Sequence, residues 1–360
     1  MATEINRELF DFLLKQQIAT GRYATQLVSD TVSLLNAADR EIMAKIVSRG
    51  EDGTITTARL NALLREIRQM VDDSYWQAEK RLHDEMGGFV VHSAASTVDV
   101  LSAQVPVAFS AVGMSPEQLT AIVSKTPISI GPDKKLLLEE IFKSLASGKE
   151  EAIRGAVRLG MVQGESMAEI TRRLMGTRAA RYQDGIIDTH RRHASNIVRS
   201  VVQHTNNTAV AATFANNKDI VRGWVYVATL DSRTCSVCFS QSGKEFELGK
   251  GPIPIRHVSC RCYQIPRVAT WRELGVDLDE MPAGKRASKG GLVDADISFH
   301  SWLKGESEKT QVDLLGKTRQ KLFADGGLKI DRFTDTSGKL YTLDALKQKN
   351  AAAFARAFGN

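Results

Sequence analysis

The sequence predicts a mainly α-helical protein: an elongated helical N-terminal body, a small α+β module with a Cys/His cluster, and a mixed C-terminal tail. Through the first 220 residues, apolar side chains recur at three- and four-residue steps, the period of a helix. Near position 224 the pattern changes to a β-type run, and all four cysteines follow between positions 235 and 262. Aromatic residues make up only 6% of the chain, which favours Ala- and Leu-rich helices over a β-sandwich.

Two long amphipathic helices are predicted at residues 23–47 and 56–83, with a turn at 50–53 between them. Residues 86–114 are poor in charge, but His, Asp and Pro interrupt them, so they lack the ~20 predominantly apolar residues of a membrane span. We expect this segment to be helical and either buried or partner-facing. The N-terminus has no signal-peptide pattern, so we expect free thiols rather than disulfides.

Capping-box patterns mark two later helix starts, at Ser115 and Ser166. Gly160 and Gly176 are predicted to end the helices around them. The sequence therefore predicts a helix, a tight turn and a second helix over residues 153–174.

A further helix, predicted within residues 177–204, is rich in arginine and has no lysine. The simplest interpretation is a solvated face on a packed helix. The alternative is a surface that contacts DNA phosphates or an acidic partner. The candidate contact residues are Arg178, Arg181, Arg191, Arg192 and Arg199.

The changes of pattern divide the chain into five predicted parts. Strands are expected at 224–228, 244–248 and 263–266, and helices of the tail at about 310–323 and from Leu343 onwards. The parts are an N-terminal helical region (1–114), a helical core with the Arg-rich helix (115–220), a small β-rich metal module (221–270), a flexible basic linker (271–296) and a C-terminal α-rich segment (297–360).

The cysteine cluster is the most specific chemical signal in the chain. Cys235 and Cys238 form a Cys-x-x-Cys pair, and His257, Cys260 and Cys262 form a His-x-x-Cys-x-Cys cluster. Zinc takes four N or S ligands in a tetrahedron, so four of these five residues suffice, and the sequence leaves open which one is spare. Four protein ligands fill the coordination sphere, so the predicted zinc is structural, and metal ligation would stabilise a module with few core residues.

Other interpretations of the cluster remain open at this point. The cysteines are alternatively small buried apolar residues, or one is a catalytic thiol with His257 as its base and Asp231 orienting the imidazole. An HNH-type metal-dependent nuclease would need a further His or Asn after Cys262, and the next histidine is His300. A zinc-stabilised DNA-binding module would have to rely on Arg256, Arg261 and Arg267.

Charge and missing motifs bound the function further. The formal net charge of +6 favours an anionic neighbour, although it is small for a dedicated DNA binder. The chain contains no nucleotide-binding glycine motif and no nucleophile-elbow motif, so no small-molecule substrate or catalytic residue is predicted.

Taken together, the motifs resemble the Mu F-like minor head proteins (head morphogenesis proteins) of tailed bacteriophages. The resemblance rests on Trp224, on Asp231-x-Arg-Thr-Cys-x-x-Cys, on Gly243-Lys244 and on Pro254-x-x-His-x-x-Cys-Arg-Cys. It extends more loosely over residues 150–345, including the helix–turn–helix near Gly160 and the tail from Trp302.

The resemblance implies a minor virion component that attaches to the portal protein inside the procapsid and aids head assembly, DNA packaging or ejection. Implied partners are the portal protein, a major capsid or scaffolding protein, and packaged double-stranded DNA. The implied location is the capsid interior near the portal, after assembly in the host cytoplasm, and no membrane or enzymatic activity is expected.

Overall fold

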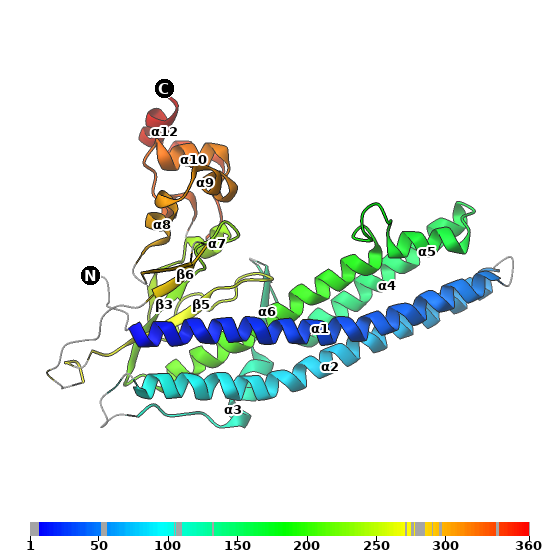
Figure 1. Ribbon diagram of the computed structural model, residues 1–360, viewed down its shortest axis with the longest axis horizontal. Helices are drawn as coiled ribbons and strands as arrows, with labels where there is room; N and C mark the ends of the chain where they lie inside the picture. The colour runs from blue at the N-terminus through cyan, green and yellow to red at the C-terminus, as the bar shows by residue number, and fades with distance from the viewer. Residues whose placement is uncertain are drawn as a thin grey trace.

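The structure is a computed structural model that describes residues 7–51, 56–103, 105, 110–131, 133–270, 272–274, 277, 285–289, 291–294, 297–335 and 338–359. Long helices form an extended body, and a smaller C-terminal arm stands at one end of it (Figure 1). Within these residues, no helix is both long and apolar enough to cross a membrane. The prediction of a mainly helical chain with a small sheet is confirmed.

Four long helices make up the body. They are α1 (Arg7–Glu51), α2 (Thr57–Ala103), α4 (Leu138–Val162) and α6 (Ile186–Asn216). α1 and α2 lie side by side along the body, and α6 runs beside them from near α5 toward the end that bears the arm (Figure 1). One apolar core includes residues of all four helices and continues into Trp224 and Tyr226. The predicted parts 1–114 and 115–220 therefore share a core with each other and with the cysteine module.

A buried polar cluster fixes how the four helices meet. Lys149 of α4 forms a 2.5 Å ion pair with Asp39 of α1, and its ammonium lies 5.5 Å from the ring centroid of Tyr75 on α2. His190 of α6 lies nearby, and burial lowers its pKa to about 4. Because a buried charge without its partner is costly, a shifted helix register would be penalised.

Shorter elements connect the long helices. They are α3 (Pro116–Lys125), the strands β1 (Ile128–Gly131) and β2 (Lys134–Leu136), and α5 (Met167–Met175). The capping boxes at Ser115 and Ser166 are present as predicted. The predicted helix end at Gly160 is wrong, because α4 continues to Val162.

Gly160 has a packing role instead. A Cβ on this residue would lie 2.4 Å from Cγ1 of Ile170, so its missing side chain lets α5 pack closely on α4. Gly176 does end α5, with a φ of +92° that favours glycine.

The loop at residues 177–185 is not helical, although the sequence places it within the Arg-rich helix. Asp184 accepts hydrogen bonds from the backbone N–H and the hydroxyl of Thr177, which closes the loop. Gly185 lies so close to the Met175 carbonyl that a Cβ there would be 2.3 Å away. The helix therefore begins only at Ile186.

The cysteine module contains a three-stranded antiparallel sheet in the order β4-β3-β5. Its strands are β3 (Val221–Val227), β4 (Glu245–Phe246) and β5 (Tyr263–Val268), in the three places where the sequence predicts strands. Trp224 stands opposite Phe246 on one side and Pro266 on the other.

The predicted flexible linker differs from the structure. Residues 285–288 and 291–294 pair as an antiparallel hairpin, β6 (Lys285–Ser288) and β7 (Gly291–Asp294), and Lys289 donates a backbone hydrogen bond to Leu230 O. Much of the rest of 271–296 lies outside the described residues. The Gly, Lys and Ser content of residues 271–296 is typical of a flexible segment, but the backbone hydrogen bonds of a hairpin need no particular side chains.

The arm is built from short helices with their own core. They are α8 (Phe299–Gly305), α9 (Glu308–Leu315), α10 (Lys317–Ala324), the 3₁₀ helix η1 (Ile330–Phe333), α11 (Leu343–Lys349) and α12 (Ala351–Phe358). The helix predicted at 310–323 is divided at Gly316, which has a φ of +75°. Leu230 and Phe239 of the cysteine module belong to this second core, so the arm rests on the module.

Candidate metal centre

The first two candidate ligands lie on a short helix, α7 (Ser236–Phe239). Cys235 is its N-cap residue and Cys238 lies one turn later, so both thiols face the same side. Backbone hydrogen bonds from Cys238 and Phe239 to the Cys235 carbonyl fix this turn. Cys238 is buried, whereas Cys235 is only partly covered.

The other three candidates lie on the loop that leads into β5. The backbone of Ser259 has a φ of +60°, and the N–H of Cys260 donates to the His257 carbonyl, so the loop folds back on itself. Cys260 and Cys262 are both buried, and Cys262 directly precedes β5. The sheet therefore brings this loop against α7.

All five candidates converge. His257 Nε2 lies 3.1 Å from Cys235 Sγ and 3.3 Å from Cys238 Sγ, and Cys238 Sγ lies 3.6 Å from Cys260 Sγ. The donor atoms form two groups that share Cys238: one with Cys235 and His257, the other with Cys260 and Cys262. Cys238 is therefore common to both halves of the cluster.

The donor set fits a soft divalent metal ion. With Zn–S bonds of about 2.3 Å, two sulfurs of a tetrahedral site lie about 3.8 Å apart, close to the Cys238–Cys260 separation. His257 Nδ1 donates to Val258 O over 2.8 Å, which leaves Nε2, the atom that faces the thiols, available as a ligand. Each group of three can thus hold a metal ion, and one donor from the other group would complete a tetrahedron.

Protonation of the cluster is strongly coupled. Hydrogen bonding with Cys238 and His257 lowers the pKa of the Cys235 thiol to about 4, and hydrogen bonding with Cys235 and Cys260 raises the pKa of His257 to about 11. Burial raises the pKa of the Cys262 thiol. Thiolate and neutral imidazole are the ligand forms, so metal binding would release protons and weaken at acid pH.

A partly buried ion pair joins the two halves of the motif. Arg261 donates two hydrogen bonds to the carboxylate of Asp231, over 2.6 and 2.9 Å. Burial would raise the pKa of Asp231, but these bonds and its contacts with Arg233 and Thr234 lower it. Asp231 thus holds the Cys260–Cys262 loop and does not orient His257, whose Nδ1 bonds to a backbone carbonyl.

Side chains of α6 support the cluster from behind, and the sequence analysis did not predict them. Gln203 and Asn207 donate hydrogen bonds to Cys262 O, over 3.3 and 3.1 Å, and Ser200 Oγ accepts one from Ser259 N. These residues are buried on α6, where the helical period alone predicts apolar side chains. The run of six polar residues at 203–208, which interrupts the apolar period of the helix, was the signal available in the sequence.

The candidate contact arginines do not form one surface. Arg191 is half-buried and bonds to Asn36 and Asp188, and Arg192 also pairs with Asp188. Arg178 and Arg181 lie exposed on the 177–185 loop, which joins α5 to α6. Of the five, Arg199 alone lines the groove beside the cysteine cluster.

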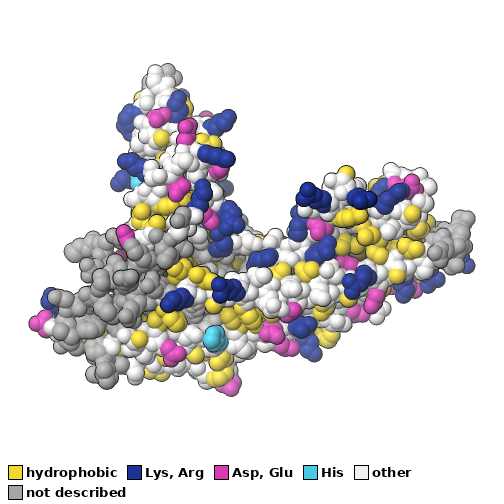
Figure 2. Space-filling view, in the orientation of Figure 1, with side chains coloured by type: hydrophobic (Ala, Val, Ile, Leu, Met, Phe, Trp, Pro, Cys, Tyr) yellow, Lys and Arg dark blue, Asp and Glu magenta, His cyan; other side chains and the backbone are white. Residues whose placement is uncertain are grey.

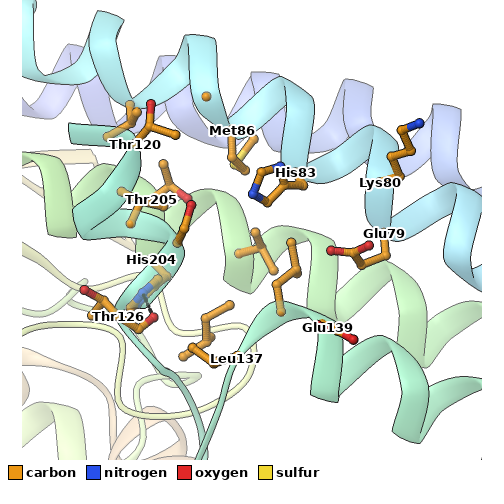
Figure 3. Close-up of a pocket in the computed structure, with 17 residues that line it drawn as sticks. Glu79, Lys80, His83, Met86, Thr120, Thr126, Leu137, Glu139, His204 and Thr205 are labelled. Carbon is orange, nitrogen blue, oxygen red and sulfur yellow. Dashed lines mark hydrogen bonds between the residues drawn. The ribbon is translucent and has the colours of Figure 1, made fainter. Parts of the chain in front are cut away.

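A separate pocket of about 360 Å³ lies between α2, α3, α4 and α6 (Figure 3). His204 is buried at its base and donates from Nε2 to Thr126 O over 3.1 Å. Burial lowers the pKa of His204 to about 4, so it is a neutral packed histidine at neutral pH. Glu79 and Glu139 stand on the wall with Lys80 and His83, which gives the pocket mixed charge.

Comparison with known proteins connects the cluster to a family. Residues 151–265 match the family model described as Phage Mu protein F like protein, which confirms the resemblance over that range. No curated protein and no solved structure matches the chain. The matched range begins in α4 and ends in β5, so it contains the whole Cys/His cluster and the α6 side chains behind it. Over residues 151–265 the chain is therefore similar to the family described as Phage Mu protein F like protein.

Proposed function

We propose that this chain is a minor head protein of a tailed phage, attached to the portal protein inside the procapsid and aiding head assembly, DNA packaging or ejection. The observation that supports this most is the family match, which covers α4 to β5 and includes the cysteine cluster. The long body supports it too, because α1 and α2 extend along it (Figure 1) and carry exposed side chains over much of their length, which a partner ring could contact.

The cysteine cluster has a structural role in this proposal. Zinc, held by Cys238 and three of the other four candidates, fixes α7 against the loop that precedes β5. Four protein ligands leave no open position for a water or a substrate, as a catalytic zinc site would need. A thiol–imidazole–carboxylate triad is disfavoured because Asp231 accepts its hydrogen bonds from Arg261 and not from His257.

Co-expression with the portal protein of the same phage tests the proposal. We expect the chain to co-purify with portal rings at about 0.5 M salt, where exposed charge contacts are largely screened, and to appear as added density on the ring in electron micrographs. An unrelated helical protein of similar pI is the control for charge-driven sticking. Intact rings that elute without the chain would contradict portal attachment.

Absence of catalysis is tested separately. We expect no cleavage of duplex DNA by the full chain in the presence of Mg²⁺, Mn²⁺ or Zn²⁺. Cleavage that disappears in a His257→Ala variant would instead support the nuclease interpretation.

A further inference from the structure

A groove of about 710 Å³ runs beside the cysteine cluster, between α1, α6 and the loop that bears His257 and Cys260. Three arginines line it from three different segments: Arg199 from α6, Arg233 from the turn before α7, and Arg261 from the loop that leads into β5, called the metal loop below. Among the described residues of its wall, none is Asp or Glu. The pocket of Figure 3, by contrast, contains two glutamates. Another groove, lined by Lys135, Lys250 and Arg256, also has no Asp or Glu in its described wall. The groove beside the cysteine cluster differs from it because all its Lys or Arg side chains are arginines.

The charges in the groove are not cancelled by their neighbours. Arg261 is fixed by Asp231, and the exposed Arg233 lies 3.6 Å from the same carboxylate. Two guanidinium groups thus share one carboxylate and keep one positive charge. Arg199 is exposed on α6 and adds a second charge. Figure 2 shows further Lys and Arg side chains gathered where the arm meets the body, near α7.

The wall of the groove is also held in place. Gln203 and Gln17, which line it, hydrogen bond to each other and to the carbonyls of Cys262 and Arg261. Asn196 lies exposed beside Arg199 on α6. Arginines with neighbouring amides on a fixed surface suit phosphate oxygens, which accept bidentate guanidinium hydrogen bonds.

We propose that this groove binds the phosphodiester backbone of duplex DNA, without reading sequence. The source of that duplex, the packaged genome, rests on the proposed function, but the chemistry of the groove does not. Contacts to backbone phosphates position a protein on DNA and release counterions, so binding weakens as salt rises. The metal loop contributes Arg261 and the backbone of Ser259 and Cys260, so the cysteine cluster shapes the groove.

Fluorescence anisotropy with a labelled 20-base-pair duplex and the full chain tests this. The test variant is Arg199→Gln/Arg233→Gln, and the control is Arg178→Gln/Arg181→Gln, which removes the same charge from exposed positions outside the groove. We expect the groove variant to lose roughly fivefold in affinity for each arginine, and its log–log salt slope to fall by about two. The control variant should lose much less. Equal losses in both variants, or none in the groove variant, would overturn the proposal.

Two further measurements identify the ligand and separate the two proposals. Unlabelled duplex should displace the probe at lower concentration than polyglutamate; the reverse order would mean that the groove takes an acidic protein instead. The groove variant should melt at the wild-type temperature and still co-purify with portal rings. We therefore expect the groove variant to lose DNA binding and to keep its binding to the portal protein. A wild-type chain that binds DNA but never binds the portal protein would count against the proposed function alone.

Discussion

Asp231 and Arg261 are the residues that turn two separated cysteine pairs into one centre. Asp231 precedes α7, and Arg261 stands between Cys260 and Cys262, so their two hydrogen bonds close the module around the donor atoms. Asp231 also accepts from the backbone N–H of Arg233 and the hydroxyl of Thr234, which shapes the turn into α7. The carboxylate therefore acts through position and not as a ligand.

Removing that carboxylate charge should weaken the fold. We expect Asp231→Asn to lower the free energy of unfolding by about 2 kcal/mol, because the partly buried guanidinium of Arg261 would lose its charged acceptor. Urea unfolding followed by circular dichroism measures this. Arg233→Gln is the matched control, since its exposed guanidinium contacts the same carboxylate and should change stability by less than about 0.5 kcal/mol. Equal effects of the two substitutions would refute this view of Asp231.

His204 makes stability depend on pH. Its folded-state pKa of about 4 lies below the ordinary value of 6.5, so between these values the unfolded chain binds a proton that the folded chain does not. Stability from this residue is therefore complete above pH 6.5 and is lost as pH falls toward 4, with about 2 kcal/mol lost between pH 7 and 5.

Urea unfolding at pH 7 and pH 5 tests this dependence. The loss on acidification should be smaller in His204→Gln than in the wild type, while the exposed His92→Gln should behave like the wild type. Identical losses in all three proteins would show that another group is responsible.

At the scale of elements, close packing of α5 on α4 depends on Gly160. We expect Gly160→Ala to destabilise the protein by about 1–3 kcal/mol, because the added methyl group would overlap Ile170 of α5. Gly155→Ala in the same helix is the control, since nothing lies within 4 Å of its Cβ position. That change should stabilise by up to about 1 kcal/mol through helix propensity. Thermal unfolding of both variants measures the difference, and stabilisation by both would contradict the packing role.

The elements that the sequence predicts well are those with local causes. Helix starts at Ser115 and Ser166 follow from capping side chains three residues apart, and the strand at 224–228 from its β-type residues. The predicted helix end at Gly160 was wrong because a glycine that allows two helices to pack closely cannot be told in sequence from a glycine that ends a helix. The hairpin at 285–294 is missed because main-chain pairing leaves little trace in composition.

The candidate site also has a part that local sequence predicts and a part that it does not. The ligand types and spacings were enough to predict a cluster of these five donors, and in the structure they form two groups of three that share Cys238. The supports from α6 were not predictable, because Gln203 and Asn207 reach Cys262 across 59 and 55 residues of chain. The arginine prediction selected residues by sequence density, whereas the groove collects its arginines from three separate segments.

At the scale of the whole molecule, α7 joins the body to the arm. One side of this short helix presents Cys235 and Cys238 to the cluster, and Phe239 stacks on Phe299 of the arm with ring centroids 5.6 Å apart. Gly338 of the arm also fits closely against Val237, where a Cβ would lie 2.8 Å from the Val237 Cα. A metal that holds α7 in place would therefore also fix the base of the arm.

The metal content of the full chain shows whether the cysteine cluster is a closed structural zinc centre. Elemental analysis of protein purified under reducing conditions should find about one zinc per chain. Cys238→Ser should hold almost none, because Cys238 belongs to both halves of the cluster, while the exposed Arg233→Gln keeps its zinc. Reduced wild-type protein without bound metal, or a full complement of zinc in Cys238→Ser, would show that the cluster is not such a centre.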